Sequence, residues 1–196
     1  GVVQTIPVSK KDSIVKRAGL KIVNFILAAY VEIFRGTPMM AQAMFIYFGS
    51  AAVFNINMSM WFAAFFIVSI NTGAYMAEII RAGIQSIDPG QMEAARSLGL
   101  TYWNSMFRVV LPQAIKNILP ALGNEFIVLI KETAISGYIG LQDLTMAGNI
   151  IRSNTYQAFL PLITVAVIYL VIVMFLSAGV QKLEKNLKKN ERHVYD

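Results

Sequence analysis

The sequence predicts an all-α membrane protein, and three observations lead to this fold class. Hydrophobic residues make up 56% of the 196 positions, and the mean hydropathy is +0.56. Only 14% of the residues are charged, whereas about 25% are charged in soluble domains. Long stretches carry no charge, and a bilayer span needs about 20 apolar residues. This composition argues against an ordinary soluble enzyme and against a disordered tail.

Two candidate spans share the first charge-free stretch. No charged residue occurs between Gly36 and Ala77, and this stretch is about twice as long as one span requires. A turn rich in Ser and Asn at 50–59 divides it. We therefore expect one transmembrane helix at about 37–54 and a second at about 60–81.

Two further candidate spans lie in the second half of the chain. The segment at about 160–180 has no charge and is the most uniformly apolar part of the sequence. The segment at about 112–132 is also apolar but contains four charged residues, Lys116, Glu125, Lys131 and Glu132. A buried helix of a soluble protein is the alternative for that segment, and its very hydrophobic neighbours argue against it.

A shorter apolar segment, Leu20–Phe34, precedes the first clear span. It is expected either to lie at the membrane interface or to form the lower part of the next helix. Gly36 can end an interfacial helix, after which Thr37 would cap the next helix with Pro38 at its first position. The Arg-Gly-Thr-Pro string is therefore expected to have a structural role.

The distribution of basic residues predicts which side of the membrane each connection faces. Cytoplasmic connections are enriched in Lys and Arg. If the four spans alternate, all of the 17 basic residues except Lys131 and Arg152 fall in or beside segments on one side. We therefore place both termini in the cytoplasm with the connection at 82–111. The net charge of +6 is then a topology signal rather than a nucleic-acid-binding surface.

Several kinds of catalytic residue are missing from the sequence. It has no Cys and one His, His193, which lies in a polar tail. This excludes a cysteine nucleophile and argues against a His-based triad or a zinc site. No G-x-x-x-x-G-K-[ST] loop is present to bind nucleotide phosphates. We expect no cofactor in this chain, and uphill transport would need an ion gradient or a partner.

The most informative part of the sequence is the connection at 82–111. Asp88 is suited to cap a helix, with Pro89 at its first position and Gln91 at N3, as in a capping box. Gly99 can adopt the left-handed conformation that ends a helix. These residues predict a short helix between them.

A second helix should follow, with Thr101 as its cap and Pro112 as the residue that stops or kinks it. In the first helix, Glu93 and Arg96 are three positions apart and can face each other. The two alanines between them allow another backbone to approach closely. These features suit a rigid helix that docks in a groove of another protein, and an ordinary helical connector is the alternative.

Four strings in the sequence resemble those of a known family. EAARSLG followed by VVLP is similar to the EAA loop of ABC-importer permeases. EIFRGTPMMAQ, AYMAEIIRAGIQSIDPGQ and LPQAIKNILPALGNEFIVLIKET resemble the polar amino-acid branch of that family, which serves His, Gln, Glu and Arg. The strings occur in the family's order, and the similarity extends from about Ala29 to Lys189.

The resemblance implies the MetI-like fold, with residues 1–196 as a single transmembrane permease domain and a cytoplasmic coupling loop at about 82–111. The family usually has five transmembrane helices, and four are clear here. We expect the first one to precede the basic stretch at Lys10 and to be missing from this sequence.

The resemblance also implies a function. The chain would be the permease subunit of an ATP-driven importer that moves a polar or charged amino acid across the bacterial cytoplasmic membrane. It would not be an enzyme, because partner subunits would bind ATP and Mg. The implied partners are ATP-binding subunits, a second permease subunit (identical or sister) and an extracytoplasmic amino-acid-binding protein. A gradient-driven secondary transporter or channel is the alternative.

Two sets of candidate site residues follow. By the resemblance, the residues of the EAA loop that couple to the ATPase are Glu93, Ala94, Ala95, Arg96, Leu98 and Gly99. Polar groups inside a membrane are costly and often functional, and they could replace the hydration of an amino acid's two charges. The candidate substrate-pathway residues are Asn71, Tyr75, Asn124, Glu125, Lys131, Glu132, Thr133 and Ser136. As alternatives, Lys131 and Glu132 can snorkel to the interface, and Glu125 can pair across a subunit interface.

Overall fold

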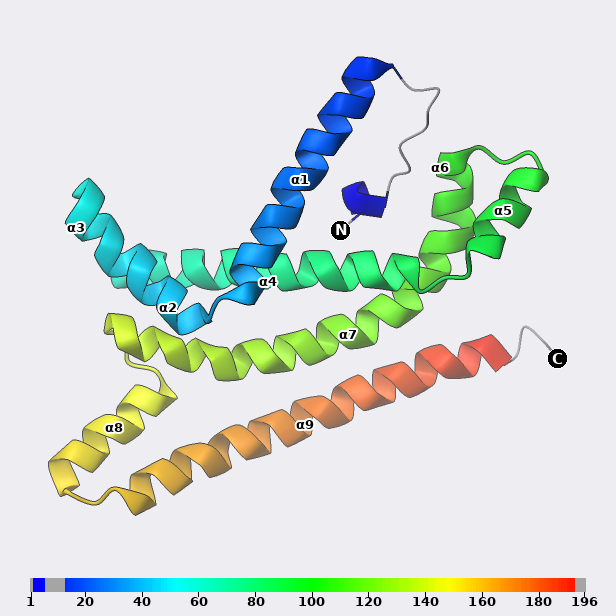
Figure 1. Ribbon diagram of the computed structural model, residues 1–196. Coiled ribbons are helices and arrows are strands. Elements are labelled where there is room, and N and C mark those ends of the chain that lie inside the picture. Colours follow the sequence, from blue (N-terminus) through cyan, green and yellow to red (C-terminus); the bar gives the residue numbers. More distant parts are fainter. Residues whose placement is uncertain (1, 6–12, 193–196) are drawn as a thin grey trace. The chain divides into compact units, whose positions relative to one another are not determined.

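The computed structural model describes residues 2–5 and 13–192, in which every regular element is helical (Figure 1). The chain forms two compact units, each assembled from separate stretches. Unit 1 comprises 1–33, 74–123 and 180–196, and unit 2 comprises 34–73 and 124–179. The predicted all-α class is confirmed.

Four long helices form the framework: α1 (Ile14–Gly36), α4 (Met60–Gln85), α7 (Leu111–Glu132) and α9 (Phe159–Arg192). In the described part of the chain, two segments are long and apolar enough to cross a bilayer, Met60–Gln85 and Phe159–Leu187. The apolar run Met39–Phe54 is shorter, and α7 carries charged and amide side chains. Composition therefore marks two of the four predicted spans strongly.

Helices α4 and α9 are longer than the apolar runs that predicted them. We expected spans at 60–81 and 160–180, whereas the helices end at Gln85 and Arg192. The last of these has 34 residues, or about 51 Å at 1.5 Å per residue, against about 30 Å for the hydrocarbon core. An apolar run predicts only the part of a helix that lies in the hydrocarbon core. Backbone hydrogen bonds can continue the helix into the polar sequence that follows.

Helix α1 begins earlier than the apolar segment Leu20–Phe34 and is separate from the next helix. It starts at Ile14 and ends at Gly36, as expected for its end. The prediction that Thr37 caps the following helix with Pro38 at its first position is wrong. Pro38 itself is the N-cap, because its ψ of 131° is extended. The first helical residue is therefore Met39.

The predicted first span consists of three consecutive helical pieces. They are α2 (Met39–Met44), a π-helical turn (Phe45–Gly49) and α3 (Ser50–Phe54). Asn55 ends the last piece in the left-handed conformation, with φ of 55°. The expected turn after the span is therefore present.

Unit 1 has a hydrophobic core formed by the end of α4 and the chain from 102 to 122. Its buried members are Ile84, Met106, Val110, Ala114 and Ile118. Gly83 faces Ile118 so closely that a Cβ at this position would collide with the isoleucine side chain. Close approach of α4 and α7 therefore depends on the absence of a side chain at Gly83.

Pro112 does not stop the helix that contains it. Helix α6 (Tyr102–Ser105) continues through a π-helical turn (Met106–Val110) into α7. Proline lacks the N–H that an α-helix uses, and π-helical turns change the hydrogen-bond spacing locally. The altered turn directly before Pro112 lets the chain remain helical, so of the predicted stop or kink the stop is absent, and Figure 1 shows that the helix changes direction between α6 and α7.

Unit 2 has its own core, where α2 and the first half of α4 pack against the 3₁₀ helix Thr133–Ile139. The buried residues are Met39, Ala43, Ala63, Ala64, Ile67 and Ile139. Helix α8 (Leu144–Thr155) follows, capped by the Asp143 side chain. Gly148 of α8 lies against Val165 of α9.

Candidate functional site

The predicted coupling helix is present as α5 (Pro89–Ser97), and its first turn is capped as expected. The Asp88 carboxylate accepts a hydrogen bond from the Gly90 N–H at 2.7 Å. Its carbonyl accepts another from the Gln91 N–H at 2.9 Å. The Gln91 side-chain oxygen instead accepts from Gln113 Nε2 at 3.3 Å. The N-cap is confirmed, and Gln91 connects α5 to α7.

The end of α5 is a Schellman motif. Gly99 has φ of +87°, its N–H donates to the Arg96 carbonyl at 3.0 Å, and the Leu100 N–H donates to the Ala95 carbonyl at 3.2 Å. These two hydrogen bonds satisfy carbonyl groups that would otherwise lack a partner at the end of the helix. Thr101 then accepts from the Asn104 N–H at 3.3 Å and caps α6. Both caps predicted from the sequence are confirmed.

Five of the six candidate coupling residues are exposed. Leu98 is 85% exposed, and Glu93, Ala94, Arg96 and Gly99 are also open to solvent. Ala95 differs, because it is only 4% exposed. The possible Glu93–Arg96 contact is not formed as an ion pair in the described part of the chain. One face of α5 is therefore open, and Ala95 lies on the face turned to its own chain.

The inner face of α5 is seated on the core of unit 1. Met92 packs against the buried cluster around Ile84 and Met106. Beside it is a cavity of about 380 Å³, with Gln85, Asp88 and Tyr102 in its wall. A displacement of α5 would therefore be passed directly to α4 and to the start of α7, whose side chains form that core.

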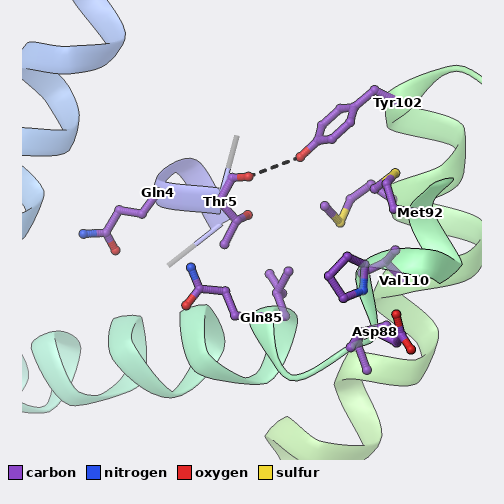
Figure 2. Close-up of a pocket in the computed structure, with 11 residues that line it drawn as sticks. Gln4, Thr5, Gln85, Asp88, Met92, Tyr102 and Val110 are labelled. Atoms are coloured by element: carbon purple, nitrogen blue, oxygen red, sulfur yellow. Dashed lines mark hydrogen bonds between the residues drawn. The ribbon is translucent and has the colours of Figure 1, made fainter. Parts of the chain in front are cut away.

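The N-terminal turn Val2–Thr5 closes one side of this cavity. The Tyr102 hydroxyl donates to the Thr5 carbonyl at 3.4 Å (Figure 2). Burial raises the pKa of Tyr102 above its ordinary value, so the phenol remains a protonated donor at neutral pH.

Asn71, a candidate pathway residue, is held in a polar network. It is 2% exposed, and its Nδ2 donates to the Phe34 carbonyl and to Gln42 Oε1, each at 3.0 Å. Gln42 was not among the sequence candidates. An amide inside a charge-free apolar run was the signal that could have identified it.

Tyr75 follows Asn71 by four positions on α4, so the two side chains share one helix face. Tyr75 is half-buried. Between them, the Thr72 hydroxyl oxygen is buried without a hydrogen-bond partner within the described residues. Both N–H groups of Asn71 are therefore bonded, and Thr72, on a different face of α4, has a hydroxyl without a partner among the described residues.

The remaining candidates lie in the second half of α7 and the 3₁₀ helix that follows. Asn124 and Lys131 are exposed, whereas Glu125 and Glu132 are half-buried. Thr133 and Ser136 line a cavity of about 270 Å³ together with Trp61, Phe65, Gln142 and Asp143. The structure brings Thr133 and Ser136 to one cavity and does not place the other candidates there.

Metal-binding residues are scarce among residues 2–5 and 13–192. No group of three or more His, Cys, Asp or Glu side chains that could hold a metal ion occurs in that part of the chain.

The sequence matches a known protein family over residues 14–189. The family is described as "Binding-protein-dependent transport system inner membrane component".

Curated relatives include transport permeases from several bacteria. The chain is 44% identical to a putative glutamine transport system permease protein, GlnP, of Rickettsia bellii, over 81% of this chain and 72% of the relative. It is 43% identical to the arginine transport system permease protein ArtQ of Bacillus subtilis, over 83% and 74%. The Escherichia coli glutamine transport system permease protein GlnP is 39% identical, over 85% and 77%.

A solved structure is also similar. It is a crystal structure of an amino acid ABC transporter with histidines, and its chain is 45% identical in sequence. The TM-score is 0.82, and the similarity covers 94% of this chain and 82% of that one.

Proposed function

We propose that this chain, which belongs to the family of inner-membrane components of binding-protein-dependent transport systems, imports a polar or charged amino acid with energy from ATP hydrolysed by partner subunits. As a permease subunit with the MetI-like fold, it is a transport component and not an enzyme. Relatives named for glutamine and arginine transport support the substrate class.

The observation that carries the proposal is the construction of α5. Its two ends are fixed by Asp88 and Gly99, its inner face is seated on the core of unit 1, and its outer face is open. A helix built in this way can receive a push from a docked subunit and transmit it to α4 and α7. We expect the exposed residues Glu93, Arg96 and Leu98 to contact the ATP-binding subunit. The buried Ala95 has a small side chain, which allows α5 to pack closely against the rest of unit 1.

The importer works with ATPase and binding-protein partners, as its family implies. In finer detail, we place one ATP-binding subunit on α5, with ATP and Mg held in that partner. A second permease subunit, identical or sister, would complete the pathway across the membrane. An extracytoplasmic protein would deliver the amino acid.

Sidedness belongs to the same proposal. The polar end of α9 carries Lys182, Lys185 and Lys189, all exposed. Basic residues favour the cytoplasmic side of a membrane, which supports a cytoplasmic C-terminus on the same side as α5. If the predicted spans alternate, the connection at 133–159 would then lie on the opposite side of the membrane.

The pathway residues complete the proposal. Thr133 and Ser136 offer hydroxyls beside the Trp61 and Phe65 rings, and Tyr75 offers a phenol further along α4. Such groups could replace part of the hydration of an amino acid as it crosses. The side chains of Glu125 and Glu132 would favour a cationic group nearby.

The experiment is uptake of a panel of amino acids into proteoliposomes that contain the complete complex, with and without ATP. ATP-dependent uptake of a polar amino acid, and co-purification of an ATP-binding subunit, are the expected results. Uptake driven by an ion gradient without any ATP-binding subunit would establish the alternative, a secondary transporter.

A further inference from the structure

The break between α1 and α2 leaves backbone groups that must find partners. Helix α1 ends at Gly36, and Pro38 at the start of α2 makes no side-chain cap within the described residues. Carbonyls at the end of a helix lack intrahelical partners. In an apolar environment an unpaired carbonyl costs several kcal/mol, so a side chain that donates to such a carbonyl stabilises the break.

Gln42 supplies these donors from the first turns of α2. Its Nε2 lies 2.9 Å from the Phe34 carbonyl and 3.0 Å from the Thr37 carbonyl, and it donates to Thr37 Oγ1 at 2.7 Å. The side chain is 9% exposed. The amide of Gln42 therefore joins the end of α1 to the start of α2.

Asn71 extends the same network to α4. Its Nδ2 donates to the Phe34 carbonyl, 37 positions away in sequence, and to Gln42 Oε1, 29 positions away. A carboxamide has two N–H donors, and each of those on Asn71 has an acceptor. Asn71 therefore has no N–H left for a solute unless one of these bonds opens.

We infer that Gln42 and Asn71 are positioning residues of transport, which tie α1, α2 and α4 together and act through this tie rather than by touching the amino acid. The inference rests on the proposed function. Because α4 is continuous from Met60 to Gln85, a bond that holds Asn71 also fixes the direction of Tyr75, one turn later. Within unit 2, the tie sets the rotation of α4 relative to α2 and to the Phe34 carbonyl.

The first test compares Gln42→Leu, Asn71→Leu and the double variant in the complete complex. We expect each single change to lower the maximal uptake rate by about tenfold. The double change should lower it no further than about twofold beyond the singles, because all three remove one shared network. KM should stay within about twofold for every amino acid in the panel, because no solute contact is lost. Gln157→Leu, an exposed glutamine in the α8–α9 connection, is the matched control and should transport normally.

Three results would overturn the inference. One is a change of KM that differs between amino acids in Asn71→Leu, which would make Asn71 a solute contact. Another is a double variant whose loss equals the product of the single losses. The third is normal uptake in both single variants.

A second measurement keeps the inference testable if the variants lose transport through poor assembly, or if the complex moves no amino acid. The chain has no Cys, so spin labels can be placed through Met44→Cys and Phe62→Cys, at exposed positions of α2 and α4 that both belong to unit 2. The interlabel distance should be narrowly distributed, and it should broaden in Gln42→Leu and in Asn71→Leu. An unchanged distribution in both would refute the tie, independently of any transport result.

The exchange variant Gln42→Asn with Asn71→Gln gives a rescue test. Each single change shortens or lengthens the amide bridge by one methylene, and the pair restores its total length. Uptake in the pair should exceed that of both singles by about threefold or more, since a hydrogen bond is regained. A pair no better than its worse single would count against the tie.

Discussion

The helix α5, the candidate for coupling, and the amide tie of Gln42 and Asn71 are both held by hydrogen bonds, but the bonds differ in range. At α5, the Gly90 N–H donates to the Asp88 carboxylate, and the Leu100 N–H donates to the Ala95 carbonyl. The partners are two and five positions apart in sequence. In the tie, the partners of Asn71 are 29 and 37 positions away. The coupling helix is a local structure with an open face, whereas the tie is a tertiary structure with no open donor. Damage to the first should affect partners, and damage to the second should affect the chain itself.

The largest expected effect comes from reversing a charge on the open face of α5. Glu93→Lys should lower ATP-dependent uptake more than tenfold, because the side chain is exposed and would repel a partner surface that accepts a carboxylate. The melting temperature of the permease should not change, because the side chain has no salt bridge in the described part of the chain.

The measurements are uptake, co-purification of the ATP-binding subunit and thermal unfolding. Asn104→Lys adds a positive charge at an exposed position of α6 and serves as the control. Normal uptake by Glu93→Lys, or equal losses in both variants, would contradict a docking role for Glu93.

The next effect concerns a close tertiary contact. Gly83→Ala should destabilise unit 1 by about 1–3 kcal/mol, because the new methyl group collides with Ile118. Gly19→Ala in α1 is the matched control, since nothing lies within 4 Å of its Cβ position. That change should be stabilising by about 0.5–1 kcal/mol. Thermal unfolding in detergent distinguishes the two, and equal shifts would mean that α4 and α7 can move apart freely.

A smaller effect is expected at the local cap of α5. Asp88→Ala removes the acceptor of the Gly90 N–H and should destabilise α5 by about 1 kcal/mol. Faster hydrogen exchange of the amides in α5, without a change in the core of unit 1, would show that the damage stays local. Asp88→Asn retains an acceptor and should preserve protection. Exchange that is equally fast in both variants would argue against the cap.

The smallest effect is expected beside the tie. Thr72→Val removes a buried hydroxyl that has no partner among the described residues, so thermal stability should stay the same or rise by up to about 1 kcal/mol. Thr37→Val removes a hydroxyl that accepts from Gln42 at 2.7 Å and should lower stability. If Thr72→Val proved the more damaging change, the Thr72 hydroxyl would have a partner in the assembled transporter.

The sequence predictions were accurate where a feature depends on residues that are close together in sequence. The caps at Asp88, Gly99 and Thr101 were predicted correctly, because each depends on residues within five positions. The end of α1 at Gly36 was also correct. Pro38 was wrongly placed inside α2, since its fixed φ suits both a helix and an extended N-cap, and only its ψ of 131° distinguishes them.

The polar candidates show the same limit. Asn71 was selected as a pathway candidate because an amide is costly in a membrane, and the structure shows that both of its N–H groups are bonded within the chain. Its partner Gln42 was missed although it is also an amide in a charge-free apolar run, and nothing in the sequence indicates that these positions, 29 apart, meet. Thr133 and Ser136 were predicted, whereas their neighbour Trp61 in the 270 Å³ cavity comes from the distant start of α4.

The sequence by itself determined the helical class, the approximate apolar cores of the spans, the capped helix α5 and the family. These follow from hydropathy, from charge and from residue types whose effects act within one or two helical turns. Tertiary structure decided which polar side chains are already saturated, how closely Gly83 lets α4 approach α7, and which coupling residue faces inward. Those properties depend on distances between segments that are remote in sequence. Hydrophobic burial brings such segments together, but it is non-directional, so the apolar pattern of a sequence does not specify which atoms come into contact.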